Sequence, residues 1–255
     1  MYEYAPADPN PEQQATKLAP TTSADPTAKT QEATQANAPA ADPAPTTPAE
    51  GSAENPTKNV IRVINNWVGD AAKELKIRLS NVNIKASNRK YQAAMDVSGG
   101  GTTKIELDGQ NVLDSDVLSS PTTSVLWAGL NKKVGGNLTI TDETSDTGET
   151  ITAKDETDTS GSLRAESGRV AAGAAAIGGN SGQATDNITI EGYATVKANT
   201  LFHDGAGIGG GNGAKGSNIT IQGHANVTAN GGWSGAGIGG GSRGERNGSF
   251  FIRRG

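Results

Sequence analysis

The sequence predicts an all-β fold, a right-handed parallel β-helix, because short phrases recur along the chain with a common step. The string GAGIGGG occurs at 205–211 and again, unchanged, at 235–241, and a degenerate copy lies at 174–180. Between these strings, the phrase NITI at 187–190 recurs at 218–221, a step of 31 residues. A fixed period of this length indicates a solenoid built from stacked repeats.

Within each repeat, apolar and polar residues alternate as they do in strands that bury one face. The glycine-rich string contains one large apolar residue, and glycine suits corners that need positive φ or close packing between coils. Each repeat is therefore predicted to form three short strands joined by corners. The side chains expected inside are Ile188, Ile190, Val196, Ile208, Ile219, Ile221, Val227 and Ile238.

The glycine-rich string also satisfies the G-x-G-x-x-G pattern of dinucleotide-binding sites, but its context argues against a nucleotide cofactor. That motif opens a helix, whereas residues 211–217 contain too much glycine for a helix. A single cofactor site also has no reason to recur at a fixed period. The strings are therefore interpreted as structural.

Asn187 and Asn218 share one repeat position, so their side-chain amides are expected to stack as a hydrogen-bonded ladder. Ser249 is next in register. Both asparagines also lie in glycosylation sequons, which matter only in a host that glycosylates its proteins.

Residues 1–57 are predicted to be a disordered, acidic tail that acts as a spacer. They contain ten of the eleven prolines, one of the 35 glycines, two lysines and eight acidic residues. Such a segment cannot bury enough apolar surface to fold. The rest of the chain is close to neutral, with 20 basic and 19 acidic residues, so no binding to nucleic acid or to an anionic membrane is expected.

No hydrophobic run reaches the length of a transmembrane helix, so no membrane insertion is expected. The opening residues, Met-Tyr-Glu-Tyr, do not resemble a signal peptide, and any export signal is expected to lie outside this sequence. The absence of cysteine fits an exported bacterial protein without disulfides. We expect a monomeric module of a longer chain.

Residues 58–75 are predicted to cap the first coil, because a bare solenoid end leaves an unpaired edge. Their apolar spacing suits a short amphipathic helix, although the β-branched residues also allow a strand. The β-helix is then expected over 76–255. Leu79, Leu107 and Ile140 are 28 and 33 residues apart, which is a looser form of the same period.

Two features disturb the array. An acidic Thr/Ser/Asp-rich stretch at 141–170 helps to separate Ile140 from Ile190 by 50 residues, which is too long for one regular coil. An insertion or an extra irregular strand is expected there. The chain ends at 250–255 as a further strand begins, so the array is expected to be truncated at its C-terminus.

Four phrases together carry a family resemblance: LKIRLSNVNIKA at 75–86, TTKIELDGQNVL at 102–113, NLTI at 137–140 and the glycine-rich array. Over about 75–252, the chain resembles bacterial surface proteins with a carbohydrate-binding parallel β-helix, similar to cell-surface pectin binders and to adhesin repeats. The resemblance implies an extracellular location, either secreted or at the cell surface. It also implies binding to a polysaccharide or to a host-surface glycan or protein, and calcium in some members.

The candidates for sugar binding are Tyr193, Phe202, His224 and Trp233. Tyr193 and His224 share one repeat position, and Phe202 and Trp233 are also 31 residues apart. Rings stacked on the corners could form a platform for a sugar face. The alternative is that they cover the apolar edge of the solenoid.

The acidic stretch offers hard oxygen ligands for calcium, with Asp142, Asp146, Asp155 and Asp158 as candidates. It lacks the EF-hand spacing and the nonapeptide repeat of calcium-binding β-rolls. A solvated acidic loop is the alternative interpretation.

The predicted function is a non-catalytic extracellular module, either carbohydrate-binding or adhesive. Outward positions carry mainly Asn, Thr, Glu, Gln and Lys, and no carboxylate pair is duplicated. The alternatives are a polysaccharide lyase or hydrolase of the pectate-lyase-like β-helix type and a purely structural stalk. A row of Thr139, Thr189 and Thr220 would be a thin surface for ice or mineral.

Overall fold

The computed structural model describes residues 49–52, 54–69, 74–86, 92–115, 127–144, 150–153, 161–168, 173–201, 204–244 and 250–252. All of them belong to one compact unit, 46–255. Residues 1–48 of the predicted tail lie outside this described part. The described part contains no helix long and apolar enough to span a membrane.

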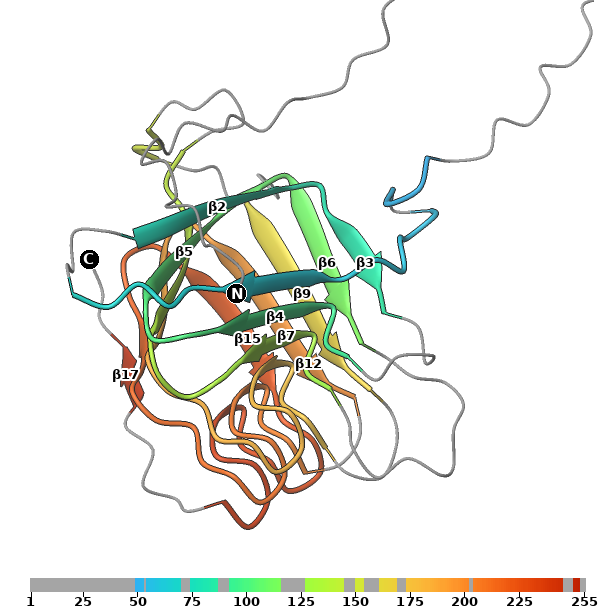
Figure 1. Ribbon diagram of the computed structural model, residues 1–255, viewed down its shortest axis with the longest axis vertical. Helices are drawn as coiled ribbons and strands as arrows, with labels where there is room; N and C mark the ends of the chain where they lie inside the picture. The colour runs from blue at the N-terminus through green and yellow to red at the C-terminus, as the bar shows by residue number, and fades with distance from the viewer. Residues whose placement is uncertain are drawn as a thin grey trace, which may run out of the picture. The chain divides into compact units, whose positions relative to one another are not determined.

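The strands form three parallel sheets, and the neighbours in each sheet come from successive turns of the chain (Figure 1). Sheet 1 contains β1 (Ile61–Ile64), β4 (Met95–Ser98), β7 (Leu130–Lys132), β10 (Ile177–Gly178), β13 (Ile208–Gly209) and β16 (Ile238–Gly239). Sheet 2 contains β2 (Glu74–Ser80), β5 (Thr102–Asp108), β8 (Asn137–Asp142), β11 (Ile188–Gly192), β14 (Ile219–Ile221) and β17 (Phe250–Ile252). Sheet 3 contains β3 (Asn83–Lys85), β6 (Gln110–Asp114), β9 (Ser162–Ser167), β12 (Thr195–Thr200) and β15 (Asn226–Asn230).

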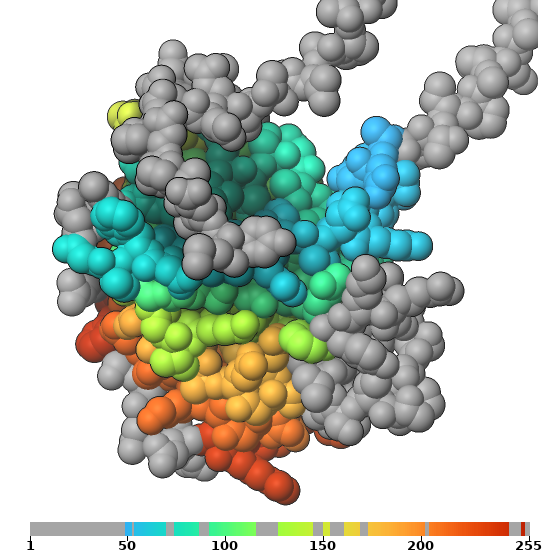
Figure 2. Space-filling view, viewed as in Figure 1, coloured from blue at the N-terminus to red at the C-terminus, as the bar shows by residue number. Residues whose placement is uncertain are grey.

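Three strands therefore make one coil, and the predicted parallel β-helix is confirmed. Coil 1 is β1 to β3, coil 2 is β4 to β6, and so on to coil 5, while β16 and β17 begin coil 6. Figure 2 shows the coils following one another in order, from cyan at one end to red at the other.

The register confirms the 31-residue period. Ile188 pairs with Ile219 and Val196 pairs with Val227, each one repeat apart. Of the eight side chains predicted inside, five are fully buried: Ile188, Ile190, Val196, Ile208 and Ile219. Ile221, Val227 and Ile238 are partly buried and pack against this core. They belong to coils 5 and 6, where fewer described coils follow to cover them.

The first coil corrects one interpretation of the sequence. Ile61–Ile64, where the apolar spacing suited a helix, form strand β1 and pair in parallel with β4. Val63 points inward and lies in register with Val97. The β-branched residues decided the outcome, because they pack well on a pleated surface. Ordered contacts also begin before residue 58, since Thr57 forms a parallel bridge with Ile84.

The early coils have a looser register than the sequence predicted. Leu79 pairs with Leu107 as expected, 28 residues apart. The partner of Ile140 is Ile105, however, and not Leu107, so this step is 35 residues rather than 33. The alternation of a strand looks the same after a shift of two residues, and this is why the sequence alone could not fix the pairing.

The 50-residue step is contained in one coil, because Ile140 pairs directly with Ile190. The extra length lies between β8, which ends at Asp142, and β9, which begins at Ser162. An antiparallel bridge joins Thr144 to Thr150 within it. The predicted insertion is therefore located at the corner between sheets 2 and 3.

The glycine-rich strings form tight loops that stack closely from coil to coil. Gly209 has a φ of 140°, and a Cβ added to it would overlap the carbonyl of Gly239 in the next coil. Within each loop the chain closes on itself, as when Ala206 N donates to Gly210 O at 3.0 Å. Side chains are excluded here by backbone packing, and this explains the invariant string.

Candidate binding site on the outer face of sheet 2

The outer face of sheet 2 carries polar side chains in register from coil to coil. One row runs through Lys76, Lys104, Thr139, Thr189 and Thr220. A second row runs through Arg78, Glu106, Thr141 and Glu191. Charge is therefore concentrated at the N-terminal end of the face, and hydroxyl groups follow it along the solenoid.

A hollow of about 290 Å³ lies at this charged end of the face. Its floor comes from β2 and β5, and the start of the insertion forms part of its wall. The residues that line it are Lys76, Ile77, Arg78, Lys104, Glu106, Glu143 and Thr144.

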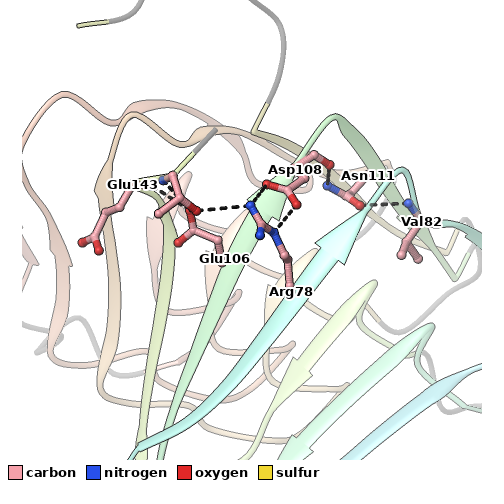
Figure 3. A network of polar contacts seen from close by, with 7 residues as sticks. Arg78, Val82, Glu106, Asp108, Asn111 and Glu143 are labelled. Carbon is pink, nitrogen blue, oxygen red and sulfur yellow. Dashed lines mark hydrogen bonds and ion pairs between the residues drawn. The ribbon is translucent and has the colours of Figure 1, made fainter. Parts of the chain in front are cut away.

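Glu106 anchors the start of the insertion to the sheet (Figure 3). Its Oε1 atom accepts hydrogen bonds from Glu143 N at 2.9 Å, Thr144 N at 2.7 Å and Thr144 Oγ1 at 2.8 Å. Hydrogen bonds to a carboxylate are stronger than those between neutral groups. Glu106 therefore fixes the wall of the hollow.

Arg78 is held in a bidentate ion pair with Asp108 (Figure 3). The Asp108 side chain is only 4% exposed, so the pair is partly shielded from water. Asn111 Nδ2 donates to the Asp108 carbonyl at 2.9 Å, and Asn111 Oδ1 accepts from Val82 N at 2.9 Å. This chain of contacts continues to the corner and fixes the position of the guanidinium group.

Lys104 donates to Glu143 at 2.7 Å. Partial burial alone would lower the pKa of Lys104, but the hydrogen bond and charge of Glu143, together with the charges of Glu74 and Glu191, raise it. Lys104 therefore stays positively charged throughout the physiological range. The neighbouring ammonium group of Lys76 is exposed, and it has no hydrogen bond or ion pair with the described residues.

The aromatic candidates are divided between two corners. Tyr193 and His224 stack, with ring centroids 4.7 Å apart and planes 7° apart, as their shared repeat position predicts. The Tyr193 hydroxyl donates to Thr152 O in the insertion at 2.6 Å. One face of the tyrosine ring is thus covered by histidine and its polar end is occupied, which supports a structural role for Tyr193.

Trp233 lies apart from that stack. It follows β15, whereas His224 precedes it, so the five-residue strand separates them by about 17 Å. The indole is 77% exposed, the most exposed large hydrophobic side chain in the described part of the chain. Phe202 lies outside the described residues. The single platform of four rings is therefore not assembled from the three rings that are described, and sugar binding by these residues stays a prediction.

Calcium binding also stays a prediction. Asp142 is 1% exposed, and its backbone carbonyl accepts from Tyr193 N at 2.8 Å. Asp146, Asp155 and Asp158 lie outside the described residues. Among the residues that are described, no three His, Cys, Asp or Glu side chains converge as a metal site would require.

The predicted asparagine ladder is confirmed. Asn218 Nδ2 donates to Asn187 Oδ1, and Asn187 Nδ2 donates to Gly136 O at 3.3 Å. Both asparagines have positive φ, 54° for Asn187 and 52° for Asn218, a conformation that asparagine tolerates better than most residues. Ser249 lies outside the described residues. The structure adds a second ladder on sheet 3, where Asn230 Nδ2 donates to Asn199 Oδ1 at 2.8 Å.

Sequence reasoning missed every residue of the hollow. The 28-residue step from Leu79 to Leu107 was the available signal, because the same step aligns Lys76 with Lys104 and Arg78 with Glu106. The approach of Glu143 depends on the path of the insertion, for which the sequence holds no comparable signal.

A family model described as "Beta helix repeat" matches residues 188–212 and 219–242. These matches fall on coils 4 and 5 and agree with the observed stacking. No curated protein and no solved structure matches the chain.

Proposed function

We propose that this chain is a non-catalytic module of an extracellular surface protein that binds a polysaccharide or a host-surface glycan. One observation carries the proposal. The outer face of sheet 2 holds a hollow of about 290 Å³ in which charged and hydroxyl side chains are already fixed by contacts with one another.

Fixed polar groups favour binding because little side-chain entropy is lost when a ligand arrives. Arg78, Lys104 and Glu106 are held by Asp108, Glu143 and Thr144 respectively. The threonine row continues from the hollow along coils 3, 4 and 5, spaced by about 4.8 Å from strand to strand. An extended glycan could therefore enter the hollow and lie along the hydroxyl row.

The contacts of the carboxylates support a binding role over catalysis. A general base must reach a proton of the substrate. Glu106 Oε1 already accepts three hydrogen bonds, and Asp108 and Glu143 are engaged in ion pairs. In this arrangement, the acidic groups shape the hollow.

A glycan array probed with the full chain tests the proposal. Thr139→Arg should crowd the outward row beside Lys104 and weaken binding to any positive glycan by about tenfold. Thr228→Arg places the same side chain at an exposed outward position of sheet 3 and should leave binding unchanged.

Three outcomes contradict the proposal. No binding to any glycan would favour the structural stalk. Equal loss in both variants would place the contact away from sheet 2. Release of new saccharide ends from a bound polymer would show that the chain is an enzyme.

A further inference from the structure

We propose that the hollow recognises an oxyanion on a sugar unit, either a carboxylate or a sulfate group, and that Lys76 and Lys104 hold it together. This inference rests on the proposed glycan binding and specifies its chemistry. It starts from two lysines that occupy one register position on neighbouring strands.

Like charges directly opposite each other on adjacent strands repel. Lys76 and Lys104 face outward from β2 and β5, and their backbones are about 4.8 Å apart. Lys104 is compensated by Glu143 at 2.7 Å, whereas Lys76 has no such partner among the described residues. An oxyanion between the two ammonium groups would accept hydrogen bonds from both and remove the repulsion.

The remaining charges of the hollow are compensated by fixed contacts. Asp108 is paired with Arg78, and Glu143 is paired with Lys104. Glu106 is stabilised by two backbone N–H groups and by the hydroxyl of Thr144. Lys76 is therefore the charge that is left to attract a ligand.

The position of Lys76 fits an incoming polymer. The hollow that it lines opens at the N-terminal end of the threonine row, which begins at Thr139 in the next coil after Lys104. An anionic unit bound by the lysines would leave neighbouring sugar hydroxyls beside Thr139 and Thr189. Charge would then select the ligand, and the hydroxyl row would extend the contact.

Three glycans of matched length distinguish the sources of the anion: hyaluronan, which carries carboxylates, keratan sulfate, which carries sulfates without uronic acid, and carboxyl-reduced hyaluronan, which is neutral. The full chain should bind at least one of the anionic glycans about tenfold more tightly than the neutral one. Raising the salt concentration from 50 to 300 mM should reduce this preference, since exposed charges are screened over about 10 Å or less.

Lys76→Gln should lower affinity for the preferred anionic glycan about fivefold and leave affinity for the neutral glycan unchanged. Lys197→Gln, which removes an exposed lysine from the outer face of sheet 3, is the matched control and should have no effect. Both variants should keep the circular-dichroism spectrum of the parent chain.

The inference fails alone if glycans bind with no preference for charge, or if Lys76→Gln and Lys197→Gln behave alike. It fails together with the proposed function if neither anionic nor neutral glycans bind.

Discussion

Coils 2 and 3 and coils 4 to 6 solve the same packing problem with different residues. In sheet 1, Asp96 and Asn131 lie in register in the early coils, and the next partner along the row is Gly178. Gly209 and Gly239 continue the row. The early coils thus present side chains on this face, whereas the later coils bring their backbones into close contact.

Sheet 2 shows the same contrast in its charges. Its outward positions hold Lys76, Arg78, Lys104 and Glu106 in coils 1 and 2, and threonine predominates from Thr139 onward. The insertion also belongs to coil 3. Regular repeats therefore build the array, and the departures from the repeat create the one charged hollow described here.

The largest expected effect lies in the regular coils. Gly209→Ala should destabilise the protein by about 4 kcal/mol, because the new Cβ would overlap the backbone of Gly239 and the φ of 140° disfavours alanine. Urea denaturation followed by circular dichroism measures this change.

Gly213→Ala is the matched control, because Gly213 also has positive φ, 77°, but nothing lies within 4 Å of an added Cβ. It should cost only about 1 kcal/mol. Equal losses in the two variants would show that backbone conformation, and not contact between coils, requires glycine at 209.

A second effect belongs to the irregular coils, where a lysine occupies an inward position. Lys132 is in register with Val97, and its side chain is 2% exposed. Its ammonium group donates to Lys133 O at 2.6 Å, Gly135 O at 2.8 Å and Asp186 Oδ1 at 3.3 Å. Lys132→Met should cost about 3 kcal/mol, because these acceptors lose their donor.

The pH dependence of that loss has a defined sign. Burial lowers the pKa of Lys132, although the charge and hydrogen bond of Asp186 oppose the shift. Between the lowered pKa and the unfolded value near 10.5, the unfolded chain binds more protons, so the contribution of Lys132 to stability rises with pH. The difference between the parent and Lys132→Met should widen as pH approaches 10.5. A difference that narrows would contradict this account, and Lys133→Met, at a half-exposed position, serves as the control.

The sequence predicted the regular coils well because their information is local and repeated. Ile188 and Ile219 share a phrase, a period and a register, so one observation supports the next. The hollow has no such redundancy. Lys76 and Lys104 become neighbours only when coils 1 and 2 are aligned, and Glu143 joins them only through the path of the insertion.

The same reasoning explains the failure at Ile61–Ile64. Apolar residues at helical spacing also fit a strand when several of them are β-branched, and pairing with β4 decided between the two. Likewise, Tyr193 and His224 were placed together by their shared period, but the distance from His224 to Trp233 depends on which side of β15 each residue lies.

The smallest expected effect concerns Trp233, which extends the comparison to the corners of the regular coils. Its indole is 77% exposed, so Trp233→Ala should leave the melting temperature and the β-sheet signal unchanged. If this ring stacks on a sugar at the far edge of sheet 3, the substitution should weaken glycan binding about fivefold, since such a contact contributes about 1 kcal/mol. His224→Ala removes a ring from the other corner and is the matched comparison. A fall in melting temperature without loss of affinity in Trp233→Ala would identify the ring as a structural cover, and binding would then rest on the irregular coils alone.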